Sequence, residues 1–197
     1  MMKKVMVLDY GAEKVAALCE LIKAQGFEVE LVGRDYRAEA IKADPSIAGV
    51  ILAGGPYTVY EDDIQVRDPE LFNMDIPLLG LGRGMQVMID CLGGTVTPAG
   101  YQYAPTPSKL SLHNTENGIF AGFDAETVKP LGFDAKVSKL PEGFKVLASG
   151  HEVESGDNRP FGAIESPEKQ LYGIQYVVDT EQSDNDQAAI RNFLNLL

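Results

Sequence analysis

The chain has 197 residues, 45% hydrophobic and 23% charged, which is ordinary for a single globular α/β domain. Its 29 acidic and 17 basic residues give a formal net charge of −12, which disfavours nucleic-acid binding because no basic stripe can replace the counterions. No apolar run is long enough to span a membrane, and the run after Lys3 and Lys4 is too short for a signal peptide. We expect one cytoplasmic domain over residues 1–197, with Cys19 and Cys91 reduced and buried, and no nucleic-acid or membrane partner.

The first half of the chain alternates short apolar runs with segments of helical periodicity. Short apolar runs bounded by turn residues are typical of buried strands, and apolar residues spaced three or four apart are typical of amphipathic helices. The expected strands are 4–8, 27–32, 49–53 and 76–79, and the expected helices are 12–24, 36–42 and 83–92. This alternation predicts a parallel, doubly wound sheet flanked by helices.

The pattern after Gly94 is rich in strands instead. Pro98, Pro105 and Pro107 interrupt it, and the pair at 117–118 indicates a turn. The expected strands are 109–113, 144–149, 161–165 and 171–176, followed by an amphipathic helix over 184–197. We find no repeat and no linker, so the prediction remains a single domain.

Residues 77–94 combine an apolar strand, a glycine-rich turn and a helical segment. A turn of this kind holds its middle residue at a positive φ and presents that side chain above the N-terminus of the helix. The middle residue here is Gly82, which has no side chain to present. The sequence therefore predicts a nucleophile elbow that lacks a nucleophile.

A second glycine-rich turn, Gly54-Gly55-Pro56, follows the third expected strand. In open α/β sheets, ligands bind in the crevice at the carboxyl ends of the strands. We expect this turn and the one containing Gly82 to face the same crevice.

Several segments, in order along nearly the whole chain, carry a family resemblance. They are residues 7–11, 49–56, 59–62, 77–86, 92–96, 118–122, 140–149 and 172–176. Together they resemble the class I glutamine amidotransferase family, and most closely the glutaminase subunit of GMP synthetase. The resemblance implies a flavodoxin-like α/β fold, with a mostly parallel central sheet flanked by helices and an added β-rich segment.

The resemblance also implies catalytic residues that this chain lacks. The family has a cysteine where this chain has Gly82, a histidine where it has Val177 and a glutamate where it has Asp179; a further family histidine corresponds to Phe133. Amide hydrolysis needs a thiolate to form the thioester and an imidazole to activate the thiol. Since glycine and valine do neither, we expect no catalytic residues and no glutaminase turnover.

Parts of the family's binding apparatus are retained. Gly54 and Gly55 resemble its oxyanion-hole turn, the amide of Arg83 occupies the other oxyanion position, and Gln86 matches a residue that contacts the substrate glutamine. Arg83, with Gly84 behind it in the first helical turn, is suited to a carboxylate or phosphate of a small anionic ligand.

Other interpretations of these residues stay open. Arg83 is equally well explained as a solvated side chain or as the partner of an acid, with Glu61, Asp62 and Asp63 as candidates. The two histidines, His113 and His151, are far from the elbow in sequence, and we expect structural roles for them.

Three hypotheses follow. The leading one is a domain without glutaminase activity that acts as a binding or regulatory subunit for a synthetase-type (ATP-pyrophosphatase) partner or a small anionic ligand, with no metal and no cofactor. The second is an enzyme with altered chemistry, in which Arg83, Asp179 and the retained amides act on a carboxylate or phosphate substrate. The third is a structural interaction module whose crevice is filled by Val177, Phe133 and Tyr176.

Overall fold

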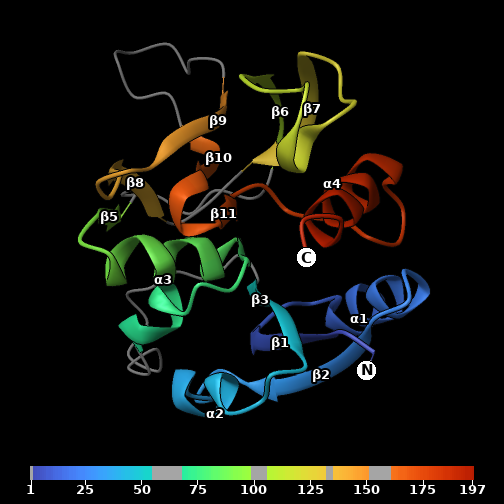
Figure 1. The fold of residues 1–197 in the computed structure, drawn as a ribbon. Helices are drawn as coiled ribbons and strands as arrows, with labels where there is room; N and C mark the ends of the chain where they lie inside the picture. Colours follow the sequence, from blue (N-terminus) through green and yellow to red (C-terminus); the bar gives the residue numbers. More distant parts are fainter. Residues whose placement is uncertain (1, 55–67, 99–105, 132–134, 151–160) are drawn as a thin grey trace.

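The computed structural model describes residues 2–54, 68–98, 106–131, 135–150 and 161–197 (Figure 1). A nine-stranded sheet with the order β2-β1-β3-β4-β11-β10-β9-β6-β7 runs through the molecule. Its first five strands are parallel to one another, as the alternating pattern predicts. These strands are β1 (Lys4–Tyr10), β2 (Glu28–Gly33), β3 (Ile47–Gly54), β4 (Leu78–Leu81) and β11 (Leu171–Ile174).

The β-rich segment continues the same sheet in antiparallel pairing. It consists of β10 (Phe161–Ser166), β9 (Lys145–Gly150), β6 (Thr106–Leu112) and β7 (Glu126–Leu131). A separate two-stranded sheet pairs β5 (Thr95–Pro98) with β8 (Ala135–Lys139), and short 3-10 helices lie at Pro69–Asn73, Gly118–Phe120 and Pro167–Lys169. The fold is therefore α/β with a mixed sheet.

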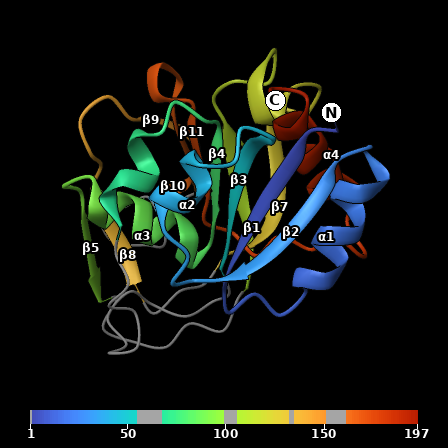
Figure 2. The same ribbon diagram turned by 60° about the horizontal axis from the view of Figure 1, so that its bottom comes forward.

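Four α-helices in the described ranges cover the two faces of the sheet (Figures 1 and 2). They are α1 (Val15–Ala24), α2 (Ala38–Lys42), α3 (Arg83–Cys91) and α4 (Asp184–Leu194). Alternate residues of the buried strands point to opposite faces. In β1, Val5 and Val7 join the core under α1 and α4, whereas Met6 and Leu8 join the core under α2 and α3. The sheet is thus buried on both faces, as a parallel sheet requires.

Several element ends differ from those expected. The first helix begins at Val15 rather than at Ala12, because the Asp9 carboxylate accepts hydrogen bonds from the backbone N–H groups of Gly11 (2.8 Å) and Ala12 (3.1 Å) and holds this segment as a turn. The last helix ends at Leu194, and β11 ends at Ile174, so the residues after it form a loop.

The two cysteines form no disulfide with each other, and only one is placed as expected. Cys19 is buried in α1, but Cys91 is half-buried at the last position of α3, so its predicted burial is wrong. None of the helices in the described part of the chain has the length and apolar character needed to cross a bilayer.

Candidate functional site

Gly82 connects β4 to α3 with φ 52° and ψ −113°. Its N–H donates to the carbonyl oxygen of Ile174 in the neighbouring strand (2.7 Å), and its own carbonyl accepts from the N–H of Gln86 (3.3 Å). These bonds hold the turn against both β11 and the helix. The positive φ predicted for the middle of the elbow is confirmed, and it is a conformation that glycine adopts at least cost.

Glycines also let the two turns approach closely. A Cβ atom on Gly84 would lie 2.2 Å from the carbonyl oxygen of Leu52, and one on Gly54 would lie 2.6 Å from the backbone nitrogen of Gly84. The start of α3 therefore packs directly on the end of β3. Gly54 and Gly82 do face one crevice, as predicted; Gly55 is outside the described residues.

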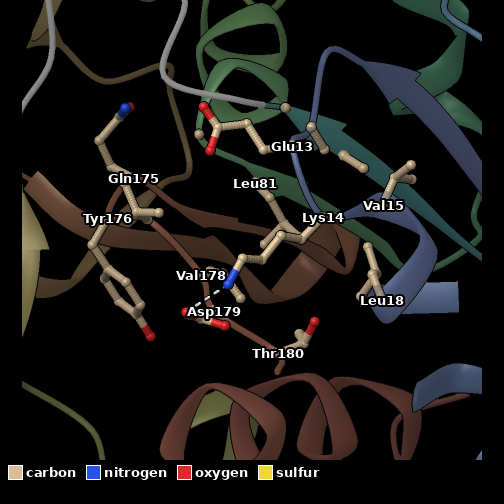
Figure 3. A pocket seen from close by; sticks show the side chains of 15 residues that line it. Glu13, Lys14, Val15, Leu18, Leu81, Gln175, Tyr176, Val178, Asp179 and Thr180 are labelled. Atoms are coloured by element: carbon tan, nitrogen blue, oxygen red, sulfur yellow. Dashed lines mark hydrogen bonds and ion pairs between the residues drawn. The ribbon is translucent and has the colours of Figure 1, made fainter. Parts of the chain in front are cut away.

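A pocket opens beside Gly82 at the carboxyl ends of the parallel strands (Figure 3). Its empty space, about 720 Å³, is partly open to solvent. One wall comes from the β1–α1 turn and the start of α1, the floor from the ends of β3 and β4, and the opposite wall from the loop after β11. The lining residues are Ala12, Glu13, Lys14, Val15, Leu18, Ala53, Gly54, Leu81, Gly82, Gln175, Tyr176, Val177, Val178, Asp179 and Thr180.

Asp179 is held by a lysine from the opposite wall. Lys14 Nζ lies 3.0 Å from Asp179 Oδ2 (Figure 3). It also lies 3.0 Å from Glu181 Oε2. The hydrogen bond from Lys14 holds the pKa of Asp179 below its usual range, and the same bond raises the pKa of Lys14. Asp179 is therefore a carboxylate at neutral pH and a weak proton acceptor.

A buried ion pair between β7 and α4 anchors the loop after β11. Lys129 Nζ in β7 lies 2.5 Å from Asp186 Oδ1 in α4, and both side chains are almost fully buried. The other oxygen of Asp186 accepts from the backbone N–H of Asp179 (2.8 Å). Lys129 also lies over the ring of Tyr176, 5.4 Å from its centroid, so the loop is fixed at both ends.

The predicted site residues separate into two groups. Val177 and Tyr176 line the pocket with Asp179; Val177 is 36% exposed and Tyr176 is buried. Arg83 and Gln86 lie at the start of α3, 5% and 1% exposed, and neither is among the described residues that line the pocket.

The positions of several other candidates are also clear. His113 is exposed, its Nε2 lies 2.9 Å from the Ser149 hydroxyl, and it is not among the described residues that line the pocket. Neither a cysteine nor a histidine is among the described lining residues. Further residues predicted to matter, in addition to Gly55, lie outside the described ranges: Phe133, His151, Glu61, Asp62 and Asp63.

Sequence reasoning missed most of the residues that line the pocket, and two polar ones show why. Lys14 lies 165 residues from Asp179, and nothing in the local pattern of either segment indicates the pair. Gln175 directly follows β11, and the strand predicted over 171–176 includes it as part of the sheet. Within the described ranges no group of three histidine, cysteine, aspartate or glutamate side chains could hold a metal ion.

Comparison with known proteins identifies the family. The model of the class I glutamine amidotransferases matches residues 6–196. The chain is 33% identical over 192 residues to the glutamine-hydrolysing GMP synthase of Streptococcus mutans, and 34% identical over 192 residues to that of Streptococcus pyogenes. Each alignment covers 97% of this chain and 36% of the relative, so the chain spans about a third of the length of these relatives.

Solved structures share the fold at low sequence identity. A GMP synthase subunit protein from Thermoplasma acidophilum superposes with a TM-score of 0.81 at 19% identity, covering 100% of this chain and 94% of that one. The PurLQS structure from Thermotoga maritima gives a TM-score of 0.73 at 15% identity, with coverage of 100% and 99%. With the elbow, the sheet order and the sequence match in agreement, the chain belongs to the class I glutamine amidotransferase family.

Proposed function

We propose that this chain is a glutamine amidotransferase domain that does not hydrolyse glutamine and acts as a binding or regulatory subunit. The observation that carries this proposal is the elbow itself: a glycine occupies the strained position above the N-terminus of α3, where the chemistry needs a nucleophile. Val177, at the position of the family's histidine, cannot accept or donate a proton through its side chain. The family fold is kept, and the described lining of the pocket contains neither a cysteine nor a histidine.

The structure gives less support to an enzyme with altered chemistry. That hypothesis needs Asp179 as a base and Arg83 as an anion clamp in one pocket. Asp179 is neutralised by Lys14, and its lowered pKa makes it a poor base. Arg83 is not among the described residues that line the pocket. The plugged module is also less well supported, because the pocket beside Gly82 is open although Val177 and Tyr176 lie in its wall.

The partner we propose is a synthetase-type ATP-pyrophosphatase protein. The support comes from the relatives: the GMP synthases that match this chain are longer, and the chain aligns with only 36% of their length. The proposed partner corresponds to the part of these relatives that the chain does not match. In such a complex this domain would affect the synthetase through binding, without delivering ammonia from glutamine.

This role can be tested by adding the purified chain to the GMP synthetase ATP-pyrophosphatase subunit of the same organism. We expect a stable complex and a changed rate of ammonia-dependent synthesis, while glutamine supports no synthesis. Val177→Asp, at the pocket mouth, should weaken any effect that acts through this face; Leu31→Asp, at a 49% exposed position of β2, is the control and should not. Glutamine-dependent synthesis by the complex would refute the proposal.

A further inference from the structure

Two arginines lie in the turn after β2, and neither has an ion-pair partner among the described residues. Arg34 is half-buried and Arg37 is exposed. Six of the described lysines do form ion pairs: Lys4, Lys14, Lys23, Lys42, Lys109 and Lys129. The chain has a formal net charge of −12, so acids to pair with are abundant. Two unpaired guanidinium groups in one turn therefore indicate a place where an external anion can bind.

The turn lies at the carboxyl end of β2, between that strand and α2 (Figure 1). The Tyr36 N–H donates to the carbonyl oxygen of Gly33 (3.2 Å), which closes the turn, and Arg37 directly precedes α2. Asp9 pairs with Gly33, so the end of β1 lies beside Arg34. Ligands of α/β sheets bind at this edge, where the parallel strands end.

Both arginines act on the same neighbour, Tyr10 at the end of β1. Tyr10 is 1% exposed and belongs to the core under α2 and α3. Burial raises the pKa of Tyr10 to about 12, while the positive charges of Arg34 and Arg37 act to lower it. Because salt screens charges beyond about 10 Å, the two guanidinium groups lie close to one place on the α2 side of the sheet. The pocket beside Gly82 is on the other side, under α1, as Leu18 shows.

The acids beside this turn are engaged elsewhere. The two carboxylate oxygens of Asp68 accept from the backbone N–H groups of Ala38 (2.9 Å) and Glu70 (3.2 Å). The Asp35 carboxylate lies over Gly33, where it would meet an added Cβ at 2.8 Å, and it is not among the charges that act most strongly on Tyr10. Asp68 thus takes the N–H at the start of α2, so an anion here must be held by the arginine side chains.

The chemistry of two guanidinium groups selects among anions. Each group forms paired hydrogen bonds with carboxylate or phosphate oxygens. A phosphate monoester carries close to two negative charges and three terminal oxygens, which match two arginines, whereas a carboxylate has one charge and two oxygens. Tyr36, half-buried against the same core, lies between the two arginines in the turn and offers an aromatic ring to the group that carries the phosphate.

We propose that Arg34 and Arg37 form a binding site for the phosphate monoester of a small molecule, with Tyr36 beside the attached organic group. A nucleic acid fits poorly, because its many phosphates would meet an acidic surface. The site goes beyond the proposed function and does not depend on it, since neither arginine is among the described residues that line the pocket. The small anionic ligand expected from Arg83 stays a separate prediction for the start of α3.

Three matched probes test the proposal on the full chain at about pH 8, where a phosphate monoester is a dianion: phenyl phosphate, phenyl sulfate and inorganic phosphate. Phenyl sulfate keeps the ring and the three terminal oxygens but carries one charge less. In a titration followed by NMR, phenyl phosphate should bind saturably and shift the backbone signals of residues 33–37. Phenyl sulfate should bind roughly tenfold more weakly because of its smaller charge, and inorganic phosphate should also bind more weakly because it has no ring.

Three variants complete the design. Arg34→Gln and Arg37→Gln should each weaken phenyl phosphate binding roughly tenfold or more, because each removes a charged hydrogen-bond donor. Lys169→Gln is the matched control: it removes the same charge from an exposed residue just before β11, at the opposite edge of the sheet, and should leave the affinity unchanged. If half-buried Arg34→Gln does not fold, exposed Arg37→Gln still decides the outcome.

The proposal is wrong if phenyl phosphate gives no saturable shifts at residues 33–37, if phenyl sulfate or inorganic phosphate binds as tightly, or if Lys169→Gln weakens binding as much as Arg37→Gln does. The last result would mean that the ligand responds only to the overall charge of the protein.

Discussion

Gly84 lies in the first turn of α3 because nothing larger fits between that turn and β3. A Cβ at this position would meet the carbonyl oxygen of Leu52 at 2.2 Å and the Cβ of Leu52 at 2.7 Å. Neither atom can move without shifting a central strand. A role for Gly84 in close packing therefore explains the residue without any ligand.

Gly84→Ala should lower the free energy of unfolding by about 2–3 kcal/mol, the usual cost of overpacking a close contact. Gly33→Ala is the matched control, because a Cβ there meets only the carboxylate of the Asp35 side chain, which can rotate away. Its effect should stay within about 0.5 kcal/mol. Urea unfolding measures both, and equal losses would contradict the packing argument.

Sequence reasoning worked at this scale where a residue's role is local. The positive φ of Gly82 follows from the strand, turn and helix around it, and the structure confirms it. The pairing of Lys14 with Asp179 could not be predicted, because it depends on where two distant segments meet in space.

Among the elements, β7 and α4 are joined by the Lys129–Asp186 ion pair, whose side chains are 6% and 3% exposed. A buried charge that loses its partner is costly, even where the pair itself adds little. The second carboxylate oxygen of Asp186 also accepts a hydrogen bond from the backbone N–H of Asp179. It therefore supports the wall of the pocket.

Lys129→Met should destabilise the protein by about 3–5 kcal/mol, because Asp186 is then buried without a counter-charge. The double variant Lys129→Met with Asp186→Leu should recover much of this loss. A double-mutant cycle from urea unfolding gives the coupling between the two side chains. If Lys129→Met alone is as stable as the wild type, the Asp186 carboxylate is not buried as described.

A second ion-pair cluster connects β1 to the turn before β3 and gives a pH dependence. Lys4 Nζ lies 2.8 Å from Asp44 Oδ2 and 2.9 Å from Glu30 Oε2. The hydrogen bond from Lys4, with further bonds from Ser46, lowers the pKa of Asp44 to about 2. Since the unfolded value is about 3.9, the stabilisation is complete above roughly pH 4 and is lost as the pH falls toward the folded value.

Asp44→Asn should therefore lower the unfolding free energy at about pH 6, and the difference from the wild type should close as the pH falls from about 4 to about 2. Denaturant unfolding at several pH values measures this difference. Glu116→Gln, at an exposed position, is the control. A difference that stays constant across this whole range would mean that the Asp44 carboxylate does not carry the effect.

The elements found from sequence are those with a strong local pattern, such as β1, β3 and α3. Sequence reasoning missed β5, β7 and β8, which have no strong local pattern. β7 contains Lys129 and Pro130, which argue against a buried strand; the structure tolerates the proline because β7 is at the edge of the sheet. Its pairing with β6 then comes from tertiary contacts rather than from strand propensity.

For the whole molecule, the family and the α/β class could be predicted, because alternating elements and motifs in fixed order constrain them strongly. The order of the strands in the sheet was harder to predict from the sequence. β11 is inserted beside β4, although a long stretch of chain separates the two strands, and this brings Val177 and Asp179 to the elbow. The pocket is therefore a property of the assembled fold, built from the start of α1 and the loop after β11.

The most direct measurement is ammonia release from glutamine by the purified full chain, alone and with the synthetase protein. The account predicts no release above the enzyme-free control, and the same result for Arg83→Ala and Gln86→Ala. Release by the wild-type chain that disappears in either variant would contradict it, because the hydrolysis would then originate in this site despite Gly82 and Val177.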